Sequence, residues 1–223
     1  KTEYETVIED RTLNSMIPLW KKQKSKIKEE EYADFYKSSF MDWNNPLKVI
    51  HYSTEGSATF TALLFIPEKA PFDFYSKEFE KGLKLYSRGV LITEKCKELL
   101  PDHFSFVRGL IDSEDVSLNI SREILQSDYQ LKLIAKAIER KIKNELVAFL
   151  EKDREGYEKF FREFGTQLTY GVYSEYGAKK DDLKDLLLFH SSKENKLISL
   201  KEYREKMDDK QKSIYYACGE SIE

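Results

Sequence analysis

The sequence predicts an α/β protein in which a larger layered α-β-α unit, a helical connector and a smaller α-β-α unit follow one another. Runs with apolar residues at every second position, typical of strands, alternate with runs in which they recur every three or four positions, typical of helices. With 223 residues and a 40% apolar composition, the chain can bury one large core or two modest ones. We place the larger unit at residues 1–127, the connector at 128–165 and the smaller unit at 166–223.

A helix and a hairpin are expected first. The run 28–40 (KEEEYADFYKSSF) carries aromatic residues at helical spacing and three Glu residues where a first turn favours anions. Two strands are predicted at 47–54 and 58–67, around a turn at 55–57. In the second strand, period-two spacing places four apolar residues on one face: Phe60, Ala62, Leu64 and Ile66.

The rest of the larger unit is expected to alternate between strand and helix. We predict a strand at 84–92 and another at 104–111. Between them, the run 94–100 (EKCKELL) is predicted to form a helix that Thr93 caps and Pro101 ends.

The connector is expected to consist of two helices. Ser127 and Gln130 have the spacing of a capping box, so the first helix should begin near Asp128. Its core-facing stripe recurs every three or four residues: Ile134, Ile138, Ile142, Leu146 and Phe149 or Leu150. The second helix, at 156–164, is predicted to stop at Gly165.

The smaller unit is predicted to contain a helix around 181–189, a second helix capped by Ser199 and Glu202, and a strand at 212–218. The chain begins without Met and ends directly after this apolar run. We therefore expect a fragment of a longer protein.

Charge and hydropathy exclude several classes of protein. Lys and Arg total 37 against 40 Asp and Glu, with the signs interspersed, which argues against a nucleic-acid binder with a basic face. The longest apolar run is about five residues, too short to span a membrane, and no signal peptide is evident, so we expect a cytoplasmic protein. Cys96 and Cys218 lie too far apart for a CxxC motif and are interpreted as buried small hydrophobic residues.

The sequence contains no self-contained catalytic set. Glycine-rich phosphate loops, HExxH and GxSxG are all missing from it. The isolated His51, His103 and His190 are interpreted as surface or structural residues, and the Lys-rich run 21–28 as a solvated loop. We expect no metal site.

An acidic trio leaves one alternative open. Asp112, Glu114 and Asp115 could hold a divalent cation, as a self-contained hydrolase would require. Adjacent side chains in a loop rarely converge on one ion, however, and turn formation or capping is the favoured interpretation.

Arg122 is the residue whose position needs an explanation. Ser121 can cap a short turn that begins with Arg122, and a cation at the start of a helical turn is disfavoured unless an anion arrives there. Glu114 or Asp115 could be its partner in a weak loop salt bridge. Alternatively, the forked guanidinium reaches a phosphate that another domain supplies.

The segment 112–126 (DSEDVSLNISREILQ) closely resembles the catalytic-loop signature of the ninety-kilodalton heat-shock (Hsp90) chaperone family. Further motifs follow in the family's order: NSMIPLWKK, EEEYADFYKS, DWNNPLKVIHYSTEG, ALLFIPEKAPFDFY, KLYSRGVLIT and SFVRGLIDSED. The resemblance covers nearly the whole chain and is to the family's middle domain. No acidic run precedes the match, which favours the bacterial branch, HtpG.

The resemblance implies a homodimeric, ATP-dependent stress-response chaperone that binds unfolded client proteins and assists their folding. ATP with Mg would be bound mainly by an N-terminal domain onto which the middle domain docks, and a C-terminal domain would dimerise. By resemblance, Arg122 matches an Arg that contacts the γ-phosphate, Gln126 a polar residue beside it, and Asn119 an Asn that supports the loop. Trp43, in DWNNP, matches a segment that faces partners or clients, although a Trp after a helix is more often a core anchor.

Two departures from the family pattern are mild: Ser117 replaces a frequent Pro, and Ile124 a frequent Met. The isolated fragment is expected to be monomeric and to lack ATPase activity. The alternative is a non-catalytic protein-interaction scaffold in which Arg122 is purely structural.

Overall fold

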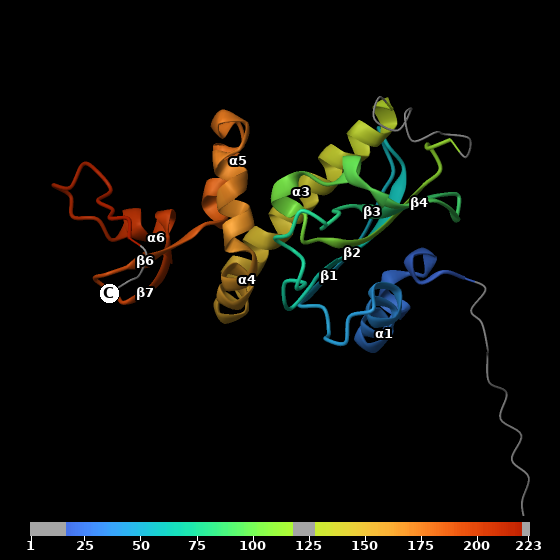
Figure 1. Cartoon of the computed structure of the whole chain (residues 1–223), viewed down its shortest axis with the longest axis horizontal. Coiled ribbons are helices and arrows are strands. Elements are labelled where there is room, and N and C mark those ends of the chain that lie inside the picture. The colour runs from blue at the N-terminus through green and yellow to red at the C-terminus, as the bar shows by residue number, and fades with distance from the viewer. Residues whose placement is uncertain (1–16, 118–127, 220–223) are drawn as a thin grey trace, which may run out of the picture.

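The computed structural model describes residues 17–117 and 128–219, and it confirms the α/β fold class. The larger part is a five-stranded sheet between helical layers, and a two-stranded sheet lies at the far end of the molecule, beyond α4 and α5 (Figure 1). The strands are β1 (Lys48–Thr54), β2 (Phe60–Ile66), β3 (Leu83–Ser87), β4 (Val90–Cys96), β5 (Arg108–Ser113), β6 (Leu188–Ser191) and β7 (Lys196–Ser199). The α-helices are α1 (Glu29–Phe40), α3 (Tyr129–Lys152), α4 (Arg154–Tyr173), α5 (Lys180–Leu183) and α6 (Leu200–Glu205).

The large sheet has the strand order β1-β2-β5-β3-β4. Its neighbouring strands are antiparallel except for β3 and β5, which run parallel. This order places β5 in the centre, and β5 is the strand that leads into the segment 112–126.

Both faces of the sheet are buried, each against its own core. On one face the predicted residues of β2 pack in the larger core: Phe60, Ala62, Leu64 and Ile66. The alternate residues Leu63 and Phe65 pack on the opposite face with Trp20, Tyr32 and Tyr36, under α1. Burial on both sides explains why β2 reads as a continuous apolar run.

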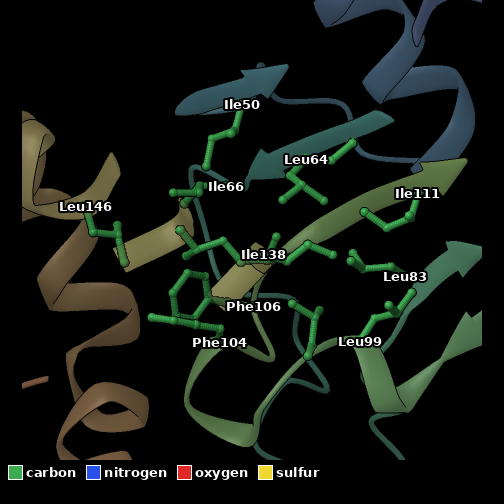
Figure 2. Close-up of a cluster of buried hydrophobic side chains, with 14 of the residues drawn as sticks. Ile50, Leu64, Ile66, Leu83, Leu99, Phe104, Phe106, Ile111, Ile138 and Leu146 are labelled. Atoms are coloured by element: carbon green, nitrogen blue, oxygen red, sulfur yellow. The ribbon is translucent and has the colours of Figure 1, made fainter. Parts of the chain in front are cut away.

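The larger core is closed by α3. Figure 2 shows Ile138 and Leu146 of this helix among Phe104, Phe106 and Ile66. The predicted stripe is confirmed, because Ile134, Ile138, Ile142, Leu146 and Phe149 are all buried. The helix begins at Tyr129 as expected, and its N-cap is Asp128, whose Oδ1 accepts a hydrogen bond from the Leu131 amide at 2.8 Å. The proposed cap Ser127 lies outside the described residues.

Two predictions for residues 84–100 were wrong. The run 84–92 is a hairpin rather than one strand, because Arg88 and Gly89 turn the chain with φ values of 50° and 82°. Two consecutive positive φ angles are the signature of a tight hairpin turn whose twist matches that of the strands. The predicted helix at 94–100 is replaced by the end of β4 and a 3-10 turn at Lys97–Leu99, since pairing with β3 holds the chain extended as far as Cys96.

The predicted stop at Gly165 was also wrong, because α4 continues to Tyr173. Gly165 is buried within the helix, and a Cβ there would meet the ring of Phe161 at 2.9 Å. Its role is therefore close packing and not helix termination.

The smaller unit differs from the prediction in two elements. The run 181–189 forms the short α5, a 3-10 turn at Lys184–Leu186 and the start of β6 instead of one helix. Residues 212–218 are irregular instead of a strand, and Cys218 is exposed, whereas Cys96 is buried as expected. The capping box of α6 is confirmed: the Ser199 amide donates to Glu202 Oε2 at 2.7 Å, and Ser199 Oγ accepts from the Glu202 amide at 3.2 Å. The division of the chain at residues 127 and 165 stays a prediction.

We predict that Gly109→Ala strongly destabilises the protein. Gly109 has a φ of 147°, and a Cβ there would lie 2.3 Å from the Leu63 carbonyl oxygen in the neighbouring strand. Because backbone cannot give way as a flexible side chain can, the free energy of unfolding should fall by about 2 kcal/mol or more in chemical denaturation. Gly56→Ala is the control, since nothing lies within 4 Å of its added Cβ. Equal stabilities of the two variants would contradict the described strand packing.

We expect the stability of the fold to depend on pH through Glu139 on α3. Its Oε1 lies 3.5 Å from His103 Nε2 and 2.7 Å from Lys179 Nζ, and these contacts lower the pKa of the carboxyl to about 2. A carboxyl with a depressed pKa stabilises the fold above its unfolded pKa of about 4.3, and this contribution disappears as the pH falls towards 2. Glu139→Gln should therefore lower the free energy of unfolding by about 1–2 kcal/mol at pH 7, a value that allows for the partial exposure of the Glu139 side chain.

The cost of Glu139→Gln should shrink steadily between pH 5 and pH 2.5, measured by denaturant unfolding at each pH. The exposed Glu68→Gln is the control. A cost that stays constant over this range would show that the carboxylate contributes no charge-dependent stability.

Candidate functional site

The candidate site is the segment that leaves the central strand β5. The predicted site residues Asn119, Arg122 and Gln126 lie outside the described residues, so their contacts stay predictions. The structure describes the start of the segment, residues 112–117, and the beginning of α3 at its other end.

Asp112, at the end of β5, is a buried carboxylate with three partners. Its Oδ2 accepts a hydrogen bond from Trp20 Nε1 at 2.9 Å, and its Oδ1 accepts one from the Gly89 amide at 3.0 Å. Lys21 Nζ lies 3.3 Å from Oδ2, while the Asp112 side chain is only 4% exposed. Burying a charge costs free energy unless it is paired and hydrogen-bonded, and here both conditions are met.

Residues 113–116 are hydrogen-bonded to the residue before β2 and to the end of β3. Ser113 Oγ donates to the Thr59 carbonyl at 2.7 Å, and Asp115 Oδ2 accepts from the Thr59 amide at 2.6 Å. Val116 is buried, and its carbonyl accepts from Ser87 Oγ at 2.5 Å. Residues 112–116 therefore form a fixed base from which the rest of the segment departs.

The far end of the segment is fixed by the cap of α3 at Asp128. Leu131, in the first turn of this helix, is fully buried in the larger core, to which Val116 also belongs. Both ends of the segment are therefore attached to one packed core, with residues 118–127 between them.

Two members of the acidic trio are engaged in structural contacts, while Glu114 is exposed. Asp112 and Asp115 accept hydrogen bonds from N–H groups of other segments, as the capping interpretation expects. Within residues 17–117 and 128–219, no group of three or more His, Cys, Asp or Glu side chains could hold a metal ion. The metal hydrolase alternative therefore gains no support from the described part of the chain.

Trp43 lies on the surface, which rules out the alternative that it anchors the core, while its role towards partners or clients stays a prediction. It is 93% exposed, beside Met41, which is 89% exposed and ends α1 with a left-handed φ of 52°. Asp42 fixes this turn, because its carboxylate accepts from the Tyr36 hydroxyl at 2.6 Å and from the Asn44 amide at 3.0 Å. The turn thus holds a large apolar side chain in solvent.

The buried tryptophan is Trp20, and sequence analysis missed its role. An indole N–H needs an acceptor when it is buried, and Asp112 is that acceptor. The apolar context of PLW was the one signal for burial, but nothing in the sequence identifies a partner 92 residues away.

Part of the Lys-rich run and His51 make structural contacts. Lys21 pairs with Asp112, and Lys22 Nζ lies 3.0 Å from a Glu31 carboxylate oxygen, so the run 21–28 is only partly a free solvated loop. His51 is hydrogen-bonded to the Tyr32 hydroxyl at 2.7 Å, and burial lowers its pKa.

None of the described helices has the length and hydropathy of a membrane span.

Comparison with known proteins identifies relatives of this chain. The family model described as Hsp90 protein matches residues 1–223. The chaperone protein HtpG of Bacillus subtilis is 58% identical over 223 residues, which cover all of this chain and 36% of that protein. HtpG of Alkaliphilus oremlandii is 58% identical over 221 residues, which cover 99% of this chain and 35% of that protein.

A solved structure shares the fold. The middle domain of a Plasmodium falciparum heat shock protein superposes with a TM-score of 0.80 at 30% identity, covering 92% of this chain and 80% of that chain. The chain spans about a third of the length of the curated relatives it matches. From these matches it follows that the chain belongs to the Hsp90 family and has the fold of the family's middle domain.

Proposed function

We propose that this chain acts as the middle domain of an ATP-dependent chaperone of the HtpG type, and that Arg122 completes the ATPase site of a preceding N-terminal domain. ATP with Mg²⁺ would be bound mainly by that domain, with Arg122 reaching the γ-phosphate when the two domains dock. The full-length protein would work as a homodimer on unfolded client proteins.

The fixed base of the segment 112–126 carries this proposal. A catalytic group contributes most when its position is set before the reaction, because no free energy is then spent on ordering it. Ser87 and Thr59 hold one end of this segment and the cap at Asp128 holds the other, which supports the proposal that the segment presents a catalytic group from fixed ends.

Arginine suits the proposed task. Its guanidinium is always charged and offers forked donors that match phosphate oxygens. In phosphoryl transfer, charge spreads over those oxygens in the transition state, and an arginine supplied from another domain can raise turnover about a thousandfold or more. Because Arg122 would reach the phosphate only after docking, turnover would be coupled to domain closure.

We predict that Arg122→Ala in the full-length protein lowers the steady-state rate of ATP turnover by about tenfold or more. The dissociation constant for ATP should stay within about twofold, since most contacts to the nucleotide would come from the N-terminal domain. Arg162→Ala, which removes an exposed arginine on α4, is the matched control and should leave both quantities unchanged. Unchanged turnover in Arg122→Ala would support the non-catalytic scaffold instead.

The exposed turn at residues 41–44 supports a contribution to client binding. An exposed tryptophan beside an exposed methionine offers adaptable apolar contact, as sites for unfolded chains require. The internal hydrogen bonds of Asp42 present this pair without any need for rearrangement.

We expect Trp43→Ser in the full-length protein to weaken binding of an unfolded model protein by about fivefold or more, measured by fluorescence anisotropy, while ATP turnover stays normal. Tyr173→Ser is the control, because Tyr173 is 82% exposed on α4 and lies outside this turn. If both variants bind the model protein equally well, the turn is not a client site.

A further inference from the structure

We propose that Met41 is a contact residue for unfolded polypeptide, that it acts together with Trp43, and that Arg108 fixes the position of both side chains. This inference rests on the proposed client role of the exposed turn at residues 41–44, and it names what the turn binds: an uncharged segment that carries aromatic residues. Arg108 is a positioning residue in this account, because it acts through Phe40 and Asp42 and not on the client.

Met41 has a backbone conformation that favours glycine. Its φ of 52° and ψ of 37° are left-handed, and glycine is the usual residue in this conformation after a helix. A Cβ atom costs free energy there. Neither burial nor a side-chain hydrogen bond offsets that cost, since the Met41 side chain is apolar and the residue is 89% exposed. Strained residues of this kind cluster at functional sites, which indicates that the side chain itself is used.

The last turn of α1 is attached to the sheet by two cations. The final carbonyls of a helix lack partners within the helix, and positive charges are favoured near them. Arg108 Nη1, at the start of β5, donates to the Phe40 carbonyl at 3.4 Å. Lys84 Nζ, on β3, donates to the Ser39 carbonyl at 3.4 Å and lies 5.3 Å from the centroid of the Phe40 ring. The sheet therefore holds the helix end from which Met41 follows.

The other side of Met41 is held through Asp42. Arg108 Nη1 lies 4.0 Å from Asp42 Oδ2, and both side chains are partly buried. The same carboxylate accepts hydrogen bonds from the buried Tyr36 hydroxyl at 2.6 Å and from the Asn44 amide at 3.0 Å. Arg108 thus contacts the residue before Met41 and the residue after it. A strained conformation persists only where the surrounding contacts impose it, and these contacts do so.

The charged groups that hold the turn are engaged within the protein. Asp42 is bound by its hydrogen-bond donors and by Arg108, while Arg108 and Lys84 donate to backbone carbonyls. The groups that the turn offers to a partner are therefore the thioether of Met41 and the indole of Trp43. Thioethers and indoles both make favourable contacts with aromatic rings. An uncharged segment with exposed aromatic residues, such as an unfolded chain presents, fits this surface.

The first test uses substitutions at Met41 in the full-length protein. The probe is a fluorescein-labelled, unstructured Gly-Ser peptide with several Phe residues, and its dissociation constant is measured by fluorescence anisotropy. Met41→Gly should bind it about threefold or more weakly, because the thioether contacts are lost. Met41→Leu, which keeps an apolar side chain, should stay within about twofold of the original affinity. A matched peptide with Glu in place of Phe should bind none of these proteins.

Stability distinguishes lost contacts from a damaged fold. Glycine adopts the left-handed conformation without strain, so Met41→Gly should melt at the same temperature as the original protein or at a higher one. Weaker binding together with undiminished stability is the result that only a contact role explains. A lower melting temperature of Met41→Gly would overturn the argument from strain.

The second test concerns Arg108. Arg108→Ala should weaken binding of the Phe peptide by about threefold and shift the fluorine resonance of Trp43 in protein labelled with fluorotryptophan, while that of Trp20 stays in place. The Trp43 signal is assigned by its loss in Trp43→Phe. When Met41→Gly and Trp43→Ser are both present, Arg108→Ala should have no further effect on binding, since no contact residue is left to position. Arg162→Ala, on α4, is the matched control and should change neither quantity.

The possible outcomes separate this inference from the proposed function. If Trp43→Ser weakens binding but Met41→Gly does not, the contact role of Met41 fails and the client role of the turn stands. If Trp43→Ser binds the peptide normally, both fail. Normal binding and an unmoved Trp43 resonance in Arg108→Ala would overturn the positioning role.

Two further results would overturn the assignment of the partner. Equal binding of the Glu peptide and the Phe peptide would show that the turn does not select uncharged aromatic segments. If the Met41 variants bind the Phe peptide normally but self-associate less in sedimentation, the turn binds a second copy of the protein instead of a client.

Discussion

The burial of the Asp112 carboxylate is the constraint on which the described part of the candidate site depends. A carboxylate in this position is tolerated only because Trp20, Gly89 and Lys21 converge on it from two other parts of the chain. The same convergence sets where the N-terminal turn lies, where the β3–β4 hairpin ends and in which direction the chain leaves β5. The paired charge of Asp112 thus connects the turn at Leu19–Lys21, the β3–β4 hairpin and the end of β5. Asp112 is also the residue at which the proposed catalytic segment begins.

The sheet supplies the rigidity that this arrangement needs. β5 lies in the centre of the sheet, with Ile111 packed in the larger core and Leu110 in the core under α1. A central strand buried on both faces can shift only if both cores repack, and tightly packed cores resist such changes. The α3 helix closes the larger core and also begins just after the segment ends, so the two attachment points share one support.

Local patterns in the sequence predicted much of this fold. The stripe of α3 and the capping box at Ser199 depend on spacings of three and four residues, which a sequence displays directly. The hairpin was missed because its turn contains a non-glycine residue with positive φ, Arg88, between two short apolar stretches that together resemble one strand. The continuation of α4 was missed because Gly165 serves packing rather than termination. The contact of Trp20 with Asp112 could not be predicted, since only the folded sheet brings these residues together. Within the site, resemblance identified Arg122, while the hydrogen bonds that fix residues 112–116 became visible only in three dimensions.

The chain contains two tryptophans, of which Trp20 donates its indole N–H to Asp112 and Trp43 is exposed. Hydrogen exchange of the two indole N–H groups, followed by nuclear magnetic resonance, measures whether Asp112 holds the N–H of Trp20. We expect Trp20 to exchange slowly and Trp43 fast, and Asp112→Asn to accelerate exchange at Trp20 alone. Equal exchange rates at the two sites, or protection of Trp20 that does not depend on Asp112, would contradict this expectation.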